Sequence, residues 1–522
     1  MKIVSAEAMR LAERMAMDRY GIPGRLLMES AGRCCCDAII EEFGAGNGRK
    51  ALIVAGKGNN GGDGYVIARF LRRCGWAVKV LVVAGKEEIS GDALVNLELL
   101  DQKDVLFCPA VSDIDDHAFS FDSADIIVDA LFGIGLSKEV LNPQKHVIEL
   151  VNRSGKPVVS VDIPSGIDGS TGRVLGAGVM ARTTVTFGFA KLGHVLYPGR
   201  EHTGRLVVVD IGLPDQVATW TEGCEFLDCA AARLILRRRD RSGHKGDFGH
   251  CLIVAGSTGK TGAAALAANS AVRAGAGLVT LAVPATLNPI LELKTTEAMT
   301  FPLDDAGMGF LGERNGETII QALQRKSVLA LGPGIGREED TFSLVKRLVR
   351  ECDLPMVIDA DGLNAIAEDK SILGEKRSSI MVLTPHPGEM SRLANLSIKE
   401  IETDRIAAAR EFAARYGVFV VLKGAGTIIA SPRGETAVNG SGNPGMASGG
   451  MGDVLTGVIA SLLGQGYEPM EACRLGVFIH GLAADLAAEE KGEIGINATD
   501  VQERLPLAFR KVADYGVKTG RN

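Results

Sequence analysis

Short apolar runs alternate with amphipathic stretches along most of the chain. The runs at 51–55 and 328–331 are purely aliphatic, whereas stretches such as 64–74 and 263–273 repeat apolar residues every three or four positions. A continuous apolar run is typical of a strand covered on both faces, and the longer spacing is typical of a helix packed on a sheet. This alternation predicts an α/β fold with mostly parallel sheets.

The predicted elements form two series that meet near residues 215–243. The first series has helices over 6–18, 25–43, 64–74 and 92–100, and strands over 51–55, 78–84, 126–129, 157–162, 185–188 and 206–210. The second has strands over 251–255, 279–283, 328–331, 356–358, 381–383 and 418–422, and helices over 263–273, 317–324, 341–350, 404–416 and 454–463. Each series has enough strands for a sheet of its own, so we expect two domains.

Composition narrows the class of protein. The chain has 522 residues, of which 46% are hydrophobic and 23% charged, and its net charge is −7. An acidic excess argues against nucleic acid as a partner. Ten cysteines make no C-x-x-C pair, which predicts reduced thiols and no zinc site. Since no signal-peptide core or membrane-length apolar run is present, we expect a cytoplasmic protein with no membrane partner.

A glycine-rich segment, Gly440–Asp453, runs directly into the helix pattern at 454–463. Glycines let backbone N–H groups crowd onto an anion, and a helix N-terminus adds partial positive charge. The same dipole is expected to keep the Asp453 carboxylate ionised and able to accept a proton. The segment therefore predicts a phosphate cradle with a base beside it. The alternative is a plain surface turn, which the six glycines between 440 and 452 make costly because each loses much backbone entropy on folding.

A second glycine-rich loop, Gly56–Gly64, follows the first predicted strand. It contains G-x-G-x-x-G, which is the pattern of a dinucleotide-binding dehydrogenase. The next strand, however, ends without the acidic residue that this fingerprint places about 20 residues further on. The loop instead carries the amides Asn59 and Asn60 and the carboxylate Asp63, which suit a cation and a polar substrate.

Two later strands also end in oxygen-bearing side chains. Asp129 ends one strand, and Asp162 with Ser165 ends another. In an open parallel sheet the carboxyl ends of the strands line one crevice, so these residues and Asn60 are expected to converge. An Asp at a strand end also caps helices, but several such ends together favour a site.

The motifs Asn59-Asn60-Gly61-Gly62-Asp63 and Asp162-Ile163-Pro164-Ser165-Gly166 resemble those of the epimerase domain of the NAD(P)H-hydrate repair enzymes, over residues 1–218. The resemblance implies a Rossmann-like three-layer α/β/α domain that interconverts the R and S hydrates of NADH and NADPH. It implies a potassium ion, K⁺, held by Asn60, Asp129 and Ser165, and Asp162 as the catalytic residue. The residues it places on the hydrate are Asn59, Asn60, Gly61, Gly62, Asp63, Gly133, Ile134, Gly135, Leu136, Ser137, Lys138, Glu139 and Asp162. Lys191 is expected either to balance charge there or to lie on the surface.

Residues 227–516 resemble the dehydratase domain of the same enzymes, which is ribokinase-like, in Leu331–Gly334, Thr384–Glu389, Leu422–Thr427 and Gly449–Asp453. The resemblance implies that ADP or ATP, with Mg²⁺, phosphorylates the 6-hydroxyl group of the S hydrate, and that loss of phosphate returns NADH or NADPH. It implies Asp453 as the catalytic base. It places the hydrate near Ala263, Gly334, His386 and Asp453, and the nucleotide at Lys423, Gly424, Ala425, Gly426, Thr427 and Gly452. Asp359 and Glu389 are candidates for holding Mg²⁺ through water, with capping as the equal alternative.

Two other interpretations stay open. One is a ribokinase-like small-molecule kinase fused to a non-catalytic Rossmann-like dinucleotide-binding domain, against which the block Asn59–Asp63 argues. The other makes the first domain a binding module only, against which Asp129, Asp162 and Ser165 together argue. We expect a homo-oligomer whose partners are small molecules, and the sequence leaves the choice between ADP and ATP open.

Overall fold

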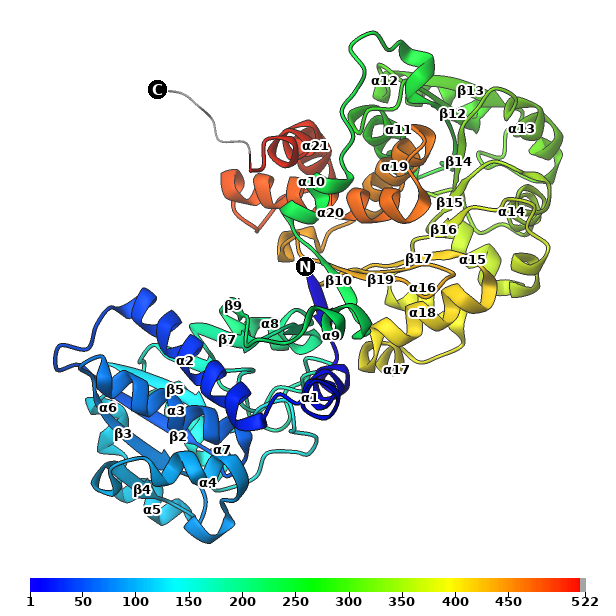
Figure 1. Cartoon of the computed structure of the whole chain (residues 1–522). Coiled ribbons are helices and arrows are strands. Elements are labelled where there is room, and N and C mark those ends of the chain that lie inside the picture. The colour runs from blue at the N-terminus through cyan, green and yellow to red at the C-terminus, as the bar shows by residue number, and fades with distance from the viewer. Residues whose placement is uncertain (517–522) are drawn as a thin grey trace. The chain divides into compact units, whose positions relative to one another are not determined.

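The computed structural model describes residues 1–516 of the chain. It divides into two compact units, one of Lys2–Cys224 and one of Met1 with Glu225–Asn522. Each unit has its own helices, strands and core, and each is described by itself (Figure 1). Within residues 1–516 no helix is both long enough and apolar enough to cross a membrane.

Seven parallel strands form the sheet of the smaller unit, in the order β4-β3-β2-β5-β6-β7-β9. The order reverses between β2 and β5, and at such a switch point the loops that leave the two strands diverge around a crevice. A further short strand, β1, pairs in parallel with β8. The strands of this unit are β1 (Lys2–Val4), β2 (Lys50–Ala55), β3 (Ala77–Val82), β4 (Val105–Phe107), β5 (Ile126–Ala130), β6 (Val158–Val161), β7 (Thr183–Phe187), β8 (Ala190–Lys191) and β9 (Arg205–Val209).

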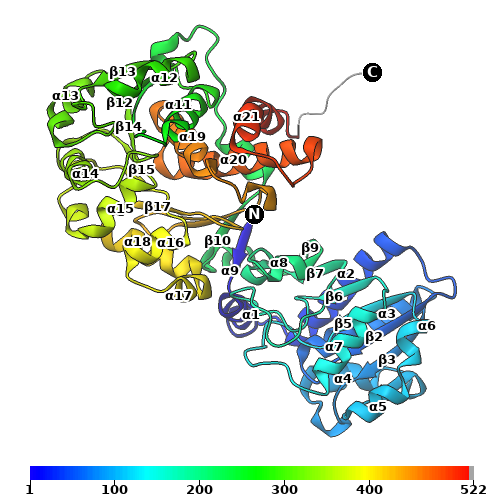
Figure 2. The ribbon, with the colours of Figure 1, turned by 180° about the vertical axis from the view of Figure 1, so that it is seen from behind.

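Helices cover both faces of this sheet, because successive side chains of a strand point to opposite faces. Ala51 and Ile53 of β2 pack with α2, α3 and α4, whereas Leu52 and Val54 pack with α5, α6 and α7. This is the predicted three-layer α/β/α arrangement (Figure 2). The helices of this unit are α1 (Ala6–Tyr20), α2 (Gly24–Phe43), α3 (Asn59–Arg73), α4 (Gly91–Glu98), α5 (Val111–Asp116), α6 (Phe119–Ser123), α7 (Gln144–Arg153), α8 (Gly199–Thr203) and α9 (Asp215–Trp220).

The larger unit contributes the strand order β13-β12-β11-β14-β15-β16-β17-β18-β19-β10. Neighbours from β13 to β17 are parallel, and β18 is antiparallel to both β17 and β19. Only residues 423–427 join β17 to β18, which is too short for a helical crossover, so the chain turns back as a hairpin. The strands are β10 (Cys224–Leu227), β11 (His250–Val254), β12 (Leu278–Pro284), β13 (Met299–Leu303), β14 (Val328–Leu331), β15 (Met356–Ile358), β16 (Met381–Leu383), β17 (Phe419–Leu422), β18 (Ile428–Ala430) and β19 (Thr436–Asn439).

One face of this sheet shares a core with α10, α11, α19, α20 and α21. Figure 1 shows α13, α14, α15, α16 and α18 on the other face. Helix α19 is apolar almost all round because it lies between the sheet and other helices, with Val454–Leu463 buried. The helices are α10 (Cys229–Ile235), α11 (Thr261–Arg273), α12 (Asn288–Lys294), α13 (Gly316–Ala322), α14 (Glu339–Glu351), α15 (Asp361–Glu368), α16 (Pro387–Ala394), α17 (Ile398–Thr403), α18 (Arg405–Tyr416), α19 (Met451–Gly464), α20 (Pro469–Lys491) and α21 (Ala498–Ala513).

One predicted boundary is wrong in a way that affects the site. Helix α3 begins at Asn59 and not at residue 64, so the block Asn59–Asp63 forms the first turn of a helix and not a loop. Its glycines hide the helical pattern, and they are there for close packing. A Cβ atom on Gly61 would lie 1.9 Å from the carbonyl oxygen of Gly56.

Candidate functional site

Asp162 lies at the carboxyl end of β6 in a strained backbone conformation. Its φ of 65° is one that residues other than glycine rarely adopt, and such strain is typical of functional sites. The backbone N–H of Asp162 donates to the carbonyl of Val185 at 2.8 Å, which ties the residue to β7. Its Oδ1 accepts hydrogen bonds from Lys191 Nζ at 2.6 Å and from Thr186 Oγ1 at 3.1 Å.

Lys191 is fully buried, with 0% of its side chain exposed, so it balances charge and is not a surface lysine. His194, which the sequence did not indicate, links Lys191 and Asp162 through two further hydrogen bonds. Burial lowers the pKa of His194 to about 3, so its ring is neutral. Its Nδ1 accepts from the backbone N–H of Lys191 at 2.9 Å, and its Nε2 donates to the carbonyl of Asp162 at 2.9 Å. The ring therefore fixes the position of Asp162 relative to Lys191.

Asp129 and Ser165, two of the predicted K⁺ ligands, are in direct contact. Ser165 Oγ donates to Asp129 Oδ1 at 2.5 Å, and the other carboxylate oxygen accepts from Ser160 Oγ at 2.8 Å. Burial raises the pKa of Asp129, and these hydrogen bonds only partly oppose the rise. Within residues 1–516 Asp129 makes no ion pair with a basic side chain, so this buried anion lacks a cation from the protein.

Asn60, the third predicted ligand, lies beside Gly133, on which a Cβ atom would be 3.2 Å from Asn60 Oδ1. Its Nδ2 is buried and has no hydrogen-bond partner within the described part of the chain. A half-turn of the amide would place its oxygen at that unpartnered position. The three residues thus offer oxygen atoms of the kind that hard cations prefer, at the carboxyl ends of the three strands β2, β5 and β6.

The two loops predicted to contact the hydrate meet at the switch point between β2 and β5. A Cβ atom on Gly56 would be 2.1 Å from the carbonyl oxygen of Leu131, so the loops touch through their backbones. Asp63 lies in the first turn of α3, and burial followed by the charges of Asp162 and Glu13 raises its pKa well above the ordinary value. In the second loop Gly133, Ile134 and Leu136 are half-buried, whereas Gly135, Ser137, Lys138 and Glu139 are exposed.

Asp453 is the third residue of α19, immediately after the glycine-rich segment. Gly450 precedes the helix with φ 91° and provides no side-chain hydrogen bond to the first turn, so the first N–H groups stay open to an anion. Burial raises the pKa of Asp453 to about 7, and the Asp359 carboxylate adds to the rise. The prediction that the helix dipole keeps Asp453 ionised is therefore wrong in degree, because burial outweighs the dipole. Near neutral pH its two forms coexist.

Lys423 lies at the centre of the acidic side chains in this unit. Its Nζ is 2.7 Å from Asp359 Oδ1 and 3.9 Å from Glu389 Oε2. Burial alone would raise the pKa of Asp359, but Lys423 and the hydroxyl of Thr456, 2.9 Å away, help to hold it below its ordinary value. Burial raises the pKa of Glu389 to about 7, with Lys423 opposing the rise.

The predicted nucleotide loop, residues 423–427, is held by a residue that sequence analysis missed. The guanidinium of Arg405 donates to the carbonyls of Leu422 and Lys423 at 3.2 Å each, and it also contacts the carbonyl of Ala425. Thr427 Oγ1 donates to the carbonyl of Gly424 at 3.0 Å. No local motif marks Arg405, because its partners are backbone atoms brought to it by the fold.

The same loop meets the glycine-rich segment. A Cβ atom on Gly452 would be 3.1 Å from Lys423 Nζ and 3.2 Å from Asp359 Oδ2. Gly452, Lys423 and Asp453 are therefore neighbours, although they lie on two segments separated in sequence. The segment itself is anchored by Asp485 of α20, which accepts from the backbone N–H of Gly442 at 2.9 Å.

The residues predicted near the hydrate form two groups. Gly334 and Ala263 are adjacent, since a Cβ atom on Gly334 would be 3.1 Å from that of Ala263. His386 caps α16, because its ring Nδ1 accepts a hydrogen bond from the backbone N–H of Gly388 at 3.0 Å. The backbone N–H of His386 donates to Glu389 Oε2 at 2.8 Å. Glu389 therefore does act as a capping residue, while it also faces Lys423.

Metal binding by clustered acidic, histidine or cysteine side chains is not seen in the described part of the chain, where no group of three or more such residues could hold an ion. The cysteines among these residues are free thiols. Any Mg²⁺ in the larger unit would thus depend on water and on the phosphates of a nucleotide, besides Asp359 and Glu389.

Each unit therefore brings a lysine and several acidic side chains together at the ends of strands or at the start of a helix. The comparisons with known proteins agree with this division. Residues 24–193 match the family model described as "YjeF-related protein N-terminus", and residues 251–507 match the model described as "NAD(P)H-hydrate dehydratase".

Similarity extends over the full length of curated relatives. The chain is 43% identical over 518 residues, 98% of each sequence, to the bifunctional NAD(P)H-hydrate repair enzyme of Moorella thermoacetica. It is 35% identical over 504 residues to that of Escherichia coli, covering 96% of this chain and 92% of the relative. The structure of an ADP/ATP-dependent NAD(P)H-hydrate dehydratase from Bacillus subtilis, co-crystallised with ATP and Mg²⁺, is 30% identical, covers 55% of this chain and 99% of its own, and superposes with a TM-score of 0.48. The resemblance drawn from the motifs is confirmed, and the chain belongs to the family of bifunctional NAD(P)H-hydrate repair enzymes.

Proposed function

We propose that the chain repairs hydrated NADH and NADPH in two steps. Residues 1–218 interconvert the R and S hydrates. Residues 227–516 dehydrate the S hydrate with ADP or ATP, giving NADH or NADPH, phosphate, and AMP or ADP. Full-length similarity to bifunctional relatives supports the pairing. The observation that carries the proposal is the Asp453 carboxyl, poised near neutrality, between a bare helix N-terminus and Lys423.

In the larger unit the first step is phosphoryl transfer to the 6-hydroxyl group of the S hydrate. Asp453 takes the hydroxyl proton, while Lys423 and the first N–H groups of α19 stabilise charge on the phosphoryl oxygens. Phosphate leaves carbon 6 far more readily than hydroxide would. Its departure with a proton from carbon 5 restores the dihydronicotinamide ring.

The binding assignments follow the same neighbours. We assign the nucleotide to Lys423, Gly424, Ala425, Gly426, Thr427 and Gly452, since Gly452 touches Lys423. We assign the hydrate to Ala263, Gly334, His386 and Asp453. Mg²⁺ would be held through water by Asp359 and Glu389, and when bound it would neutralise charge on the nucleotide phosphates.

In the smaller unit Asp162 is the group we place next to the reacting carbon. Lys191 and His194 fix its position, as a proton-transferring group requires. Asn59–Asp63 and Gly133–Glu139 would contact the hydrate. The fit of K⁺ to Asn60, Asp129 and Ser165 is supported by two observations on residues 1–516: Asn60 Nδ2 is buried without a hydrogen-bond partner, and the buried Asp129 carboxyl group makes no ion pair with a basic side chain. When bound, K⁺ would supply that charge and order the loops.

A direct test uses purified hydrates and the intact chain. With S hydrate, absorbance at the reduced-nicotinamide band should return only when ADP or ATP is added. With R hydrate and no nucleotide, chiral chromatography should show conversion to the S form faster than in buffer. Recovery without nucleotide, or R hydrate that equilibrates no faster than in buffer, would overturn the corresponding half.

The same assay separates this proposal from the kinase alternative. A kinase fused to a non-catalytic domain would leave R hydrate unchanged and would accumulate a stable phosphorylated product. A cytoplasmic location and a homo-oligomeric state stay predictions of the sequence.

A further inference from the structure

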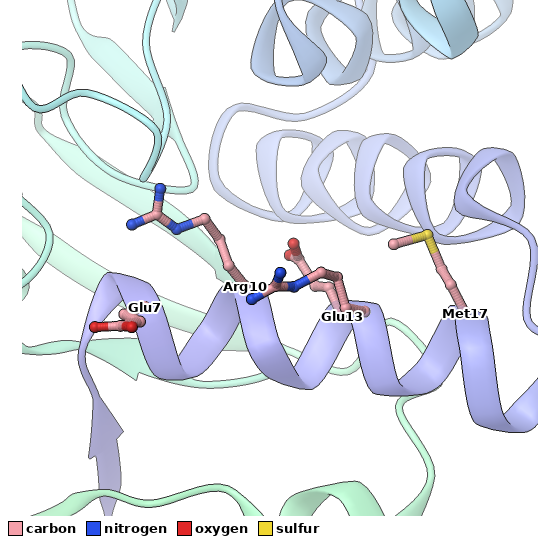
Figure 3. A pocket seen from close by; sticks show the side chains of 5 residues that line it. Glu7, Arg10, Glu13 and Met17 are labelled. Atoms are coloured by element: carbon pink, nitrogen blue, oxygen red, sulfur yellow. The ribbon is translucent and has the colours of Figure 1, made fainter.

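Helix α1 carries an acidic side chain, Glu13, that the proposed epimerase chemistry has not yet used. It lines a pocket of about 400 Å³ with Glu7, Arg10, Arg14 and Met17. Figure 3 shows Arg10, Glu13 and Met17 leaving α1 on the same side. Glu13 is only half-buried, so a ligand in the pocket has access to it.

The start of the chain places α1 beside the end of β6. Val4 of β1 pairs with Lys191 of β8. The backbone N–H of Ala6 then donates to Ser170 Oγ at 3.0 Å, in the segment that follows Asp162. One turn later Met9 lies near Gly188, on which a Cβ atom would be 3.5 Å from the Met9 methyl group.

Glu13 follows Met9 by four residues, so it lies on the same face of the helix, one turn further on. That face is the one directed at the strand ends that carry Asp162 and Lys191.

Three acidic groups, Asp162, Glu13 and Asp63, therefore lie near one lysine, Lys191, in this unit. Lys191 is bonded to Asp162 at 2.6 Å, so it is not available as a hydrogen-bonded partner for Glu13. Burial, followed by the negative charge of Asp162, raises the pKa of Glu13 to about 7, while Lys191 and Arg10 oppose the rise. Asp63, on α3, also feels the charge of Glu13. A group in this setting holds a proton close to neutral pH.

Resting on the proposed epimerase function, we propose that Glu13 is the proton-donating partner of Asp162 in the interconversion of the hydrates. Asp162 takes the proton of the hydroxyl group on carbon 6. The C6–N1 bond breaks with its electron pair going to N1, and the Glu13 carboxyl gives its proton to N1. Carbon 6 becomes an aldehyde. Rotation about the C5–C6 bond presents its other face to N1, and the reverse transfers close the ring and restore both carboxyl groups.

Two carboxyl groups with different neighbours suit this exchange. The Asp162 carboxylate is held by the Lys191 ammonium group, which fixes it in place as a proton acceptor. Among residues 1–516 Glu13 makes no such ion pair, and burial raises its pKa, which favours the form that donates a proton. Enzymes separate the roles of acid and base in this way by the environments of two like groups.

The test measures conversion of purified R hydrate by the full chain without nucleotide. Glu13→Gln should lower the catalysed rate by about 10²–10⁴-fold, the usual contribution of general acid–base catalysis. Wild type should lose activity above about pH 7, because burial raises the pKa of Glu13 to about 7. Glu13→Asp should keep measurable activity, because it keeps an acid. Asp18→Asn, on the same helix outside the pocket lining, should behave as wild type.

The outcomes separate the two proposals. If wild type does not equilibrate R hydrate, the epimerase assignment fails. If wild type is active and Glu13→Gln matches it in rate and pH profile, the role of Glu13 alone is overturned. Folding of Glu13→Gln is judged by its melting temperature and its nucleotide-dependent dehydration. If the variant does not fold, the pH–rate profile of the wild type decides, because an epimerisation rate that does not fall above pH 7 contradicts the proposal.

Discussion

Each unit surrounds one lysine with three acidic side chains, but the position of the candidate base relative to that lysine differs between the units. In the smaller unit Lys191 bonds directly to Asp162, the candidate base, while Glu13 and Asp63 lie outside the pair. In the larger unit the lysine bonds to Asp359, and the candidate base, Asp453, lies outside the pair.

The difference follows from what each site has to neutralise. In the larger unit Lys423 interacts with two carboxylates, since its Nζ lies 2.7 Å from Asp359 and 3.9 Å from Glu389. Phosphoryl oxygens arriving at the helix N-terminus can share it. In the smaller unit a fully enclosed lysine serves one carboxylate, and Thr186 and His194 complete the enclosure. The first arrangement suits a charged cosubstrate, and the second suits a fixed proton acceptor.

The largest effect should come from removing the two candidate bases separately. Asp453→Asn should lower nucleotide-dependent dehydration by about 10²–10⁴-fold and leave R-to-S conversion unchanged. Asp162→Asn should do the reverse. Each variant is the control for the other, and both rates are read on the same preparation. Loss of both activities in either variant would contradict two independent sites.

A second test concerns K⁺, which is proposed for the smaller unit and not for the larger one. Ser160 Oγ donates to Asp129 at 2.8 Å but is not itself a proposed ligand. Loss of such a supporting bond typically costs about 10–100-fold in metal affinity. Ser160→Ala should therefore raise the K⁺ concentration that gives half-maximal epimerisation, with dehydration unaffected. An unchanged K⁺ titration would count against the site.

Glycine substitutions test how tightly each loop is packed. Gly61→Ala would force a Cβ atom to within 1.9 Å of a backbone oxygen, whereas Gly58→Ala meets nothing within 4 Å. Gly61→Ala should lower the free energy of unfolding by about 1–3 kcal/mol, and Gly58→Ala is its matched control. Gly452→Ala, which meets the end of a flexible lysine at 3.1 Å, should cost less. Urea denaturation checks the order, and equal losses for Gly61→Ala and Gly58→Ala would refute it.

The smallest expected effect is the change of reaction rate with pH, about tenfold per pH unit. Its direction should be opposite for the two activities. Dehydration needs Asp453 ionised, so its rate should fall as the pH drops below about 7. Epimerisation needs the Glu13 proton, so its rate should fall as the pH rises above about 7. Parallel pH–rate profiles for the two activities would break the comparison.

Folding stability depends on the same two groups. Glu13 and Asp453 both have raised pKa values, so the stability that their neutral forms provide is lost as the pH rises through about 7.

The fold was largely predictable because each strand is a local signal. The segments 328–331, 356–358 and 381–383 are strands with the predicted limits, since a short apolar run between helices has few other uses in an α/β protein. The start of α3 was not predictable, because its glycines are explained only by the Gly56 carbonyl that packs against them. Strands β18 and β19 were also missed, because a hairpin edge carries no helix to mark its limits.

The candidate site divides in the same way. Asp129, Asp162, Ser165 and Asp453 could be singled out from their places at strand and helix ends. Glu13 and Arg405 could not, because nothing around them in sequence distinguishes them from other charged residues on helices.

By itself the sequence determined most of the strands and helices, the two glycine-rich segments, and the family to which the chain belongs. These depend on short-range patterns, in which a few adjacent residues fix a backbone conformation. Tertiary structure decided the charge state of the acidic groups and the partner of each lysine. Those depend on burial and on distances between residues far apart in the chain, and so the helix dipole that the sequence indicates at Asp453 is outweighed by desolvation that only the packed unit imposes.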